Sequence, residues 1–288
     1  MPHVTTNGME TYYERTGQGP PVVFIHGLGM DHRSWRPQML ALEDDYDTIA
    51  YDYRGHGESD SSTPGDYTVE RLAEDLHALL NELDVERPVL CGHSYGGLIA
   101  AEYTIQHPDD VAALAFADAR TDMGETAVER AIFKLQPIFA RIQRIMGRER
   151  FDRAMEFVAE RLTDVEQGPD EEVPELGHTP SEYASEASSA VSTDELSRFM
   201  TAGQDYVGTN PTDFHVPVLY AYGELSQGVI ADKADRLERA PTDVRVHEVE
   251  NAGHTLMLQQ PDRFANTLRD FLDDVTPTTT ETNDEPTK

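Results

Sequence analysis

Hydrophobic positions along the chain fall into two alternating patterns. Short continuous apolar runs are typical of strands buried on both faces of a sheet, and they occur at residues 21–25, 47–51, 88–91, 111–117, 216–222 and 243–249. Between them, apolar residues recur at helical spacing in residues 34–42, 68–83, 98–107, 230–239 and 264–272. Near the N-terminus, two short segments flank Asn7-Gly8, a strong signal for a hairpin turn. This alternation predicts an α/β fold with a parallel sheet covered by helices on both faces.

The alternation breaks between residues 121 and 213, where the pattern is helical and includes an acidic loop at residues 164–180. A helical insertion between two strands of a parallel sheet is typical of a cap. We therefore predict a core formed by residues 1–120 and 214–275, and a helical cap formed by residues 121–213. The tail, residues 276–288, is rich in Thr, Pro and acidic residues and is predicted to be disordered.

The charge of the chain narrows its partners. It carries 23 Lys and Arg residues against 54 Asp and Glu residues, for a net charge of −31. Such a surface repels phosphates and argues against nucleic-acid binding. Because Lys is also scarce, the composition predicts a halophilic protein that stays soluble in high salt and repels itself in low salt. The simpler alternative is an acidic cytosolic protein.

Cysteine usage and the N-terminus indicate where the protein works. Cys91 is the only cysteine, so an intrachain disulfide is impossible and a reducing compartment is natural. The first residues lack the basic and apolar regions of a signal peptide, and no apolar run approaches the roughly 20 residues of a membrane span. We therefore expect a cytoplasmic protein without membrane contact, either a monomer or a homodimer.

One strand leads into a glycine-flanked serine. The apolar run ending at Cys91 turns through Gly92-His93-Ser94-Tyr95-Gly96 into a predicted helix. The pattern Gly-x-Ser-x-Gly between a strand and a helix is a nucleophile elbow, in which a Cβ at Gly92 or Gly96 would clash. The strained apex lifts the Ser94 hydroxyl clear of the sheet. Without partner residues, the same pattern is merely a tight turn.

The partners of Ser94 can be sought along the chain. Its proton needs a base, and His254 lies in a Gly-bearing loop between the last strand and the last helix, where its ring can reach the elbow. An oxyanion needs two backbone donors. We expect the amide of Tyr95, directly after the serine, and that of Leu28, in the turn that follows the strand at residues 21–25.

These motifs together resemble the α/β-hydrolase superfamily: His26-Gly27, Asp52-x-Arg54-Gly55-x-Gly57-x-Ser59, Gly92-x-Ser94-x-Gly96-Gly97 and Gly253-His254 follow its order. The resemblance implies the α/β-hydrolase fold, with an eight-stranded sheet, a cap after the sixth strand and a Ser-His-acid triad. Haloalkane dehalogenases and epoxide hydrolases of this superfamily carry an aspartate at the nucleophile position. With Ser94 there, the chain looks like the serine esterase-like branch.

The triad acid departs from the usual pattern. Most members place an aspartate a few residues beyond the seventh strand, where this chain has Ser226. Two carboxylates remain as candidates. Asp118 ends the strand beside the elbow strand, as in some haloalkane dehalogenases, and we favour it. Glu224 is the alternative, although it directly follows Gly223 and comes early for a turn toward His254.

The substrate side is less defined by the sequence. Trp35, near the oxyanion turn, either reaches the pocket or only packs in the core. The cap holds seven basic residues between Arg130 and Arg153, which either pair with the acidic segment at residues 164–195 or draw in an anionic substrate. No histidine pair has helical ligand spacing near carboxylates, so no metal site is predicted.

The sequence therefore predicts a serine hydrolase without cofactor that cleaves a small carboxylic ester or lactone through an acyl-enzyme. Two alternatives stay open. One is a C–C bond hydrolase of diketones, which uses the same residues. The other is a ligand receptor of the same fold with weak turnover.

Overall fold

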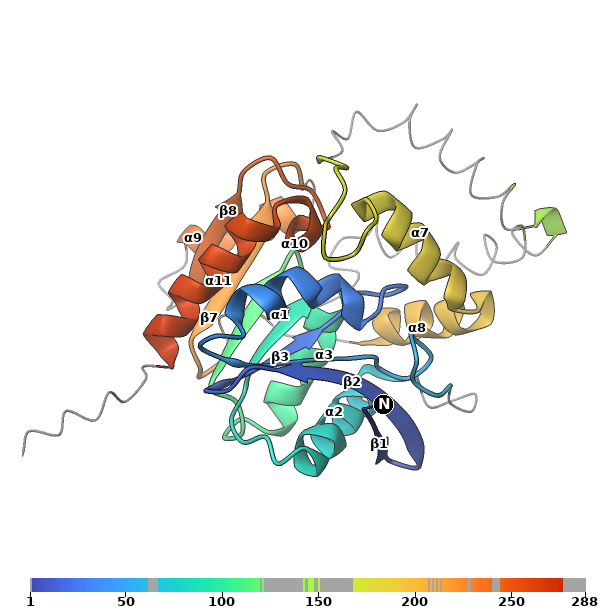
Figure 1. The fold of residues 1–288 in the computed structure, drawn as a ribbon, viewed down its shortest axis with the longest axis horizontal. Coiled ribbons are helices and arrows are strands. Elements are labelled where there is room, and N and C mark those ends of the chain that lie inside the picture. Colours follow the sequence, from blue (N-terminus) through green and yellow to red (C-terminus); the bar gives the residue numbers. More distant parts are fainter. Residues whose placement is uncertain are drawn as a thin grey trace, which may run out of the picture.

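The computed structural model describes residues 2–61, 67–119, 121, 142, 145–147, 150, 168–206, 208, 210, 212, 214–226, 229–239 and 244–276. Within these residues an eight-stranded sheet has the order β1-β2-β4-β3-β5-β6-β7-β8 (Figure 1). Its strands are β1 (His3–Thr6), β2 (Met9–Thr16), β3 (Pro21–Ile25), β4 (Asp47–Tyr51), β5 (Val89–His93), β6 (Ala113–Ala117), β7 (Val218–Gly223) and β8 (Val244–Val249). Strands β3 to β8 are parallel, and β1 and β2 form the antiparallel hairpin predicted around Asn7-Gly8.

Helices cover both faces of the sheet, as the sequence predicts (Figure 1). One face packs against α2 (Val69–Glu82), α3 (Tyr95–Gln106) and α9 (Val229–Arg239). The other packs against α1 (Arg36–Leu42), α10 (Leu256–Gln259) and α11 (Pro261–Val275). Alternate strand residues enter the two cores, so that Leu90 faces the first and Cys91 the second. Cys91 is fully buried, which makes it a packing residue.

Local signals set the helix ends. Thr68 caps α2, because its side chain accepts a hydrogen bond from the Arg71 amide. The helix expected at residues 34–42 is divided into a 3₁₀ turn, η1 (His32–Trp35), and α1. Asp31 accepts a hydrogen bond from the Arg33 amide and starts this turn. None of the helices in the described part of the chain has the length and apolar character needed to cross a bilayer.

Two helices of the predicted cap are described, α7 (Pro180–Ala190) and α8 (Thr193–Asp205), and in sequence both lie between β6 and β7. Each begins with a capping box, formed by Thr179 with Glu182 and by Ser192 with Glu195. The tail beyond residue 276 lies outside the described residues. So does most of the basic segment at residues 130–153, of which only residues 142, 145–147 and 150 are described.

Both helices of the predicted cap are hydrogen-bonded to residues beside the carboxyl ends of the strands. The Tyr183 hydroxyl of α7 donates to the Asp31 carbonyl at 3.1 Å. The Tyr95 hydroxyl of α3 donates to the Phe199 carbonyl of α8 at 3.1 Å. The core residues of these bonds follow the turn after β3 and the elbow after β5, so the cap helices border that edge of the sheet.

Candidate active site

Ser94 lies at the apex of the turn between β5 and α3. Its backbone has φ 50° and ψ −114°, in the left-handed region that an L-residue enters only at a cost. The turn is tight, because a Cβ on Gly92 would lie 2.6 Å from the Gly96 carbonyl oxygen. A Cβ on Gly96 would meet the Ile25 carbonyl in the same way. The chain therefore forms the elbow predicted from its sequence, with the serine hydroxyl at its apex.

His254 reaches Ser94 from the loop between β8 and α10. Its Nε2 lies 3.0 Å from the Ser94 Oγ, across 160 positions of sequence. Its Nδ1 lies 2.6 Å from Oδ2 of Asp118. Because a carboxylate only accepts, Nδ1 carries the proton and Nε2 is free to accept the serine proton. The structure thus brings the three residues into the chain of hydrogen bonds that a serine hydrolase uses.

Asp118 is held in place by hydrogen bonds to β7 as well as by its contact with His254. It directly follows β6, and its amide donates to the Ala221 carbonyl at 2.7 Å. Its Oδ1 accepts from the Gly223 amide at 3.2 Å, so each carboxylate oxygen has its own partner. The side chain is 1% exposed. Burial strengthens its interaction with the imidazole, since little water competes for the charge.

Glu224, the alternative acid, lies elsewhere. Its Oε2 accepts from the Asn251 amide at 2.8 Å, so its carboxylate is bound to the backbone of the loop after β8. Its amide donates to the Val249 carbonyl. Neither bond involves His254. Of the two open candidates, the structure brings only Asp118 to the histidine ring.

The expected oxyanion donors are Leu28 and Tyr95. The Tyr95 amide is the first of α3 and has no carbonyl within the helix to donate to. The Leu28 turn is held by His56, whose Nε2 accepts from the Gly29 amide at 3.1 Å. Burial lowers the pKa of His56 to about 4, so this ring stays neutral and keeps accepting. No hydrogen bond within the described part of the chain engages the Leu28 amide.

Trp35 belongs to the core. Its side chain is fully buried and packs against Phe24 and Phe264, with ring centroids 5.0 and 6.2 Å away. It is not among the described residues that line the pocket next to His254. Of the two alternatives considered for Trp35, the structure shows the packing role, on the sheet face that α1, α10 and α11 cover.

A pocket of about 490 Å³ opens beside Asp118 and His254. Its described walls are largely apolar and include Pro180 and Ala184 of α7 and, from elsewhere in the chain, Leu225 and Ile230. Ser226 also lines it, at the position where the resemblance leads one to expect the acid. The Ser226 hydroxyl is buried and has no hydrogen-bond partner in the described part of the chain. Sequence reasoning did not assign this residue a role, because an unpaired hydroxyl leaves no mark in a sequence.

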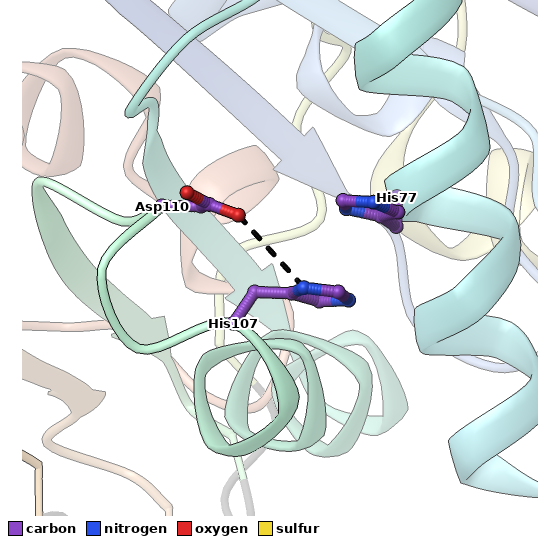
Figure 2. A group of neighbouring side chains, drawn as sticks. All are labelled: His77, His107 and Asp110. Atoms are coloured by element: carbon purple, nitrogen blue, oxygen red, sulfur yellow. Dashed lines mark ion pairs between the residues drawn. The ribbon is translucent and has the colours of Figure 1, made fainter.

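A histidine cluster that the sequence did not predict lies away from this pocket, between α2 and the end of α3 (Figure 2). Nitrogen and oxygen atoms of His77, His107 and Asp110 come within 4.8 Å of one another. The two rings are parallel, with centroids 3.9 Å apart and planes at 3°. A metal ion binds an imidazole in the plane of its ring. Two parallel planes share no such point, so one ring must turn before both can ligate one ion.

A second buried group, His32 with Asp31 and Asp52, is tied up by its own hydrogen bonds. Asp52 accepts from the His32 ring at 2.9 Å and from the His32 amide at 2.7 Å. Burial opposes the charge on His32, but the hydrogen bonds to Asp52 and Glu14 outweigh it and raise the pKa of His32 to about 9. This ion pair fixes the turn after β4 to the start of η1, so Asp52 has a structural role here.

Comparisons with known proteins bear on the family and the fold of the chain. Residues 20–261 match the family model described as "alpha/beta hydrolase fold". A segment of 109 residues, 37% of the chain, is 43% identical to non-heme chloroperoxidase CPO-A1 of Kitasatospora aureofaciens, and it spans only 39% of that protein. Over 92% of the chain and 75% of the relative, identity to epoxide hydrolase 3 of Xenopus tropicalis is 28%. The solved structure of the enol-lactonase from Burkholderia xenovorans LB400 superposes with a TM-score of 0.70, at 25% identity, over 94% of this chain and 99% of that one.

Proposed function

The chain belongs to the α/β-hydrolase fold family, and we propose that it is a serine hydrolase that cleaves a small carboxylic ester or lactone. The observation that carries this proposal is the pair of distances from His254, 3.0 Å to the Ser94 Oγ and 2.6 Å to Asp118. Two of these residues, Asp118 and His254, line a pocket of about 490 Å³, and its mostly apolar walls suit a small neutral acyl compound.

The reaction follows from the roles of the side chains. His254 Nε2 takes the Ser94 proton as Oγ attacks the carbonyl carbon, and Asp118 stabilises the imidazolium that forms. The amides of Leu28 and Tyr95 donate to the oxyanion. His254 then returns the proton to the leaving alcohol, which leaves an acyl ester on Ser94. A water molecule, activated by the same imidazole, attacks this ester and releases the acid.

The nucleophile also bears on the epoxide hydrolases among the relatives. If Ser94 opened an epoxide, its oxygen would form an ether with the substrate carbon. An ether has no carbonyl at which water can attack, so Ser94 would stay alkylated. An acyl ester on the same oxygen is hydrolysed readily, because its carbonyl can form a second tetrahedral intermediate. Turnover with Ser94 therefore favours acyl substrates over epoxides.

The proposal is tested first at Ser94. A fluorophosphonate probe should label the wild-type protein once, and Ser94→Ala should abolish both the adduct and the hydrolysis of every ester tested. Ser189→Ala serves as a control, because Ser189 is an exposed serine on α7 whose hydroxyl only donates to the Ser185 carbonyl. An undiminished adduct on Ser94→Ala, read by intact-protein mass spectrometry, would overturn the proposal.

A panel of esters, lactones and diketones then separates the remaining alternatives. Ester or lactone turnover above about 1 per second is what an enzyme of this kind should reach. If only diketones are cleaved, the protein is a C–C bond hydrolase that uses the same triad. Turnover far below that rate on all three classes, together with tight binding of one compound, would identify a receptor.

A further inference from the structure

His93 directly precedes the candidate nucleophile and reaches the same histidine that Ser94 does. Its Nε2 lies 2.8 Å from the backbone carbonyl oxygen of His254, across 161 positions of sequence. The two rings lie 4.8 Å apart between centroids. Two consecutive residues therefore contact His254 at different points, since Ser94 meets its ring and His93 meets its backbone.

Both the direction of this hydrogen bond and the charge of the His93 ring can be assigned. A carbonyl oxygen only accepts, so the His93 proton lies on Nε2 and the lone pair lies on Nδ1. Burial and, to a smaller extent, the neighbouring His254 lower the pKa of His93 to about 3. The ring is therefore neutral throughout the pH range in which a serine hydrolase works. It donates the same hydrogen bond whether His254 is neutral or protonated.

The ring of His93 is supported on its other sides. The edge of Trp35 meets it with centroids 6.5 Å apart and planes at 79°, and Trp35 itself is fully buried. A Cβ on Gly27 would lie 2.6 Å from the His93 Nδ1, so only glycine leaves room for the ring at this point. The Nδ1 atom has no hydrogen-bond partner within the described part of the chain. The His93 ring is thus held by packing, and among the described residues its only polar contact is the one to His254.

The His254 loop needs such a contact. The His254 side chain is 56% exposed, so packing alone does not restrain its ring. Gly253, the residue before it, is tied to α10 by a hydrogen bond from its amide to the Gln259 side chain at 2.7 Å. The bond from His93 instead ties the His254 backbone to the end of β5, on which the elbow is built. It therefore links the loop of the base directly to the strand that leads into the nucleophile.

We propose that His93 is a positioning residue, which sets the place of His254 relative to Ser94 by donating a hydrogen bond to the His254 backbone carbonyl. The inference rests on the proposed serine hydrolase function, because the positioning matters only if His254 is the base. His93 itself transfers no proton, since its Nε2 is occupied and its ring stays neutral. Removing the donor lets the His254 loop shift, and small shifts of a reacting group cost rate steeply.

The test compares His93→Gln with His93→Leu. The glutamine amide can place an N–H where the histidine has Nε2, whereas leucine fills similar space and has no donor. We expect His93→Leu to lower kcat and the rate of fluorophosphonate labelling roughly tenfold, as the loss of one buried hydrogen bond predicts. KM should change little, because the bond does not touch the substrate. His93→Gln should keep most of the wild-type rate at a melting temperature similar to that of His93→Leu.

Equal losses in the two variants would show that packing, and not the hydrogen bond, matters at this position. Wild-type kcat in His93→Leu would overturn the proposal as well. The proposed function can fail separately, because Ser94→Ala would then hydrolyse esters as the wild type does. If His93→Leu does not fold, nitrogen-15 NMR of the wild-type histidines decides. One ring must carry its proton on Nε2 and stay neutral down to about pH 5, and titration of His93 between pH 5 and 8 would refute the assignment.

Discussion

The Oδ2 atom of Asp118 lies 2.6 Å from Nδ1 of His254, although 136 positions separate the two residues. Asp118 directly follows β6, which lies between β5 and β7 in the sheet. Carboxyl ends of neighbouring parallel strands share one edge of the sheet, so Asp118 and the elbow residue Ser94 come side by side. The acid can therefore follow the sixth strand without any change in the sheet.

Replacement of Asp118 is the first test of this arrangement. We expect Asp118→Asn to lower kcat by about 10⁴ with little change in KM, because an amide in this place favours the wrong tautomer of His254 and cannot stabilise the imidazolium. The matched control is Glu224→Gln, since among the described residues the Glu224 carboxylate accepts only from the Asn251 amide. Steady-state kinetics on folded variants decide. If Glu224→Gln is silent and Asp118→Asn is active, the acid is Glu224.

A second prediction moves the acid to the position after β7. Ser226 and Asp118 line the same pocket as His254, and the Ser226 hydroxyl has no partner within the described part of the chain. A carboxylate placed there can replace the one lost from Asp118. The double variant Asp118→Asn with Ser226→Asp should regain at least roughly tenfold in kcat over Asp118→Asn alone.

The single variant Ser226→Asp is its control. Two carboxylates near one imidazole repel each other, so this variant should be no faster than the wild type. If the double variant is as slow as Asp118→Asn, position 226 does not face His254, and the relation between the two acid positions is wrong.

The strand and helix pattern predicted most of the fold because the parallel strands are buried on both faces and so are continuous in the sequence. The elbow was also visible there, since its glycines, its serine and the following helix are contiguous. The acid was not. Spacing along the chain placed both Asp118 and Glu224 near strand ends, and only the fold shows which carboxylate turns toward the histidine.

The sequence also does not predict the direction in which two other side chains point, those of Trp35 and His93. Trp35 sits close in sequence to the oxyanion turn, yet its ring points into the core, where Phe24 and Phe264 surround it. His93 lies next to Ser94 in the elbow, yet its ring bonds to the backbone of residue 254. In each case the deciding contact is with a residue far away in the chain, which no local pattern encodes.

Alkaline pH should destabilise the fold through His32. Its pKa is raised from 6.5 to about 9 because the hydrogen bonds to Asp52 and Glu14 outweigh the opposing effect of burial. A raised pKa in the folded state means that the stabilisation is complete below pH 6.5 and is lost as the pH rises through 9. The loss should be on the order of 3 kcal/mol in the free energy of unfolding.

Urea unfolding between pH 6 and 9.5 at constant ionic strength measures this loss. His32→Gln is the comparison, because its amide can still donate to Asp52 but does not titrate. Its free energy of unfolding should be lower at pH 6 and nearly flat across the interval. A wild-type protein that is equally stable at pH 6 and 9.5 would rule out a charged His32 in the fold.

Salt dependence tests the halophilic prediction. With 54 acidic side chains and 23 basic ones, the chain carries an excess of 31 negative charges. Their repulsion acts over a Debye length of about 10 Å at 0.1 M salt and about 3 Å at 1 M. Surface ion pairs such as Arg263 with Glu250 are weakened by the same screening, but each contributes only about 0.2–1 kcal/mol. Relief of repulsion should therefore dominate.

We expect the melting temperature to rise by roughly 10 °C between 0.05 and 2 M KCl, since each kcal/mol shifts the melting temperature of a chain of this size by about 2–4 °C. The rise should be steepest below about 0.5 M, where the Debye length changes most. Sucrose at matched osmolality is the control, because it stabilises proteins by exclusion and screens no charge. Two outcomes would contradict the prediction: sucrose raises the melting temperature as much as KCl does, or KCl leaves it unchanged. In either case the acidic surface does not make the fold depend on salt, and the protein is an ordinary acidic one.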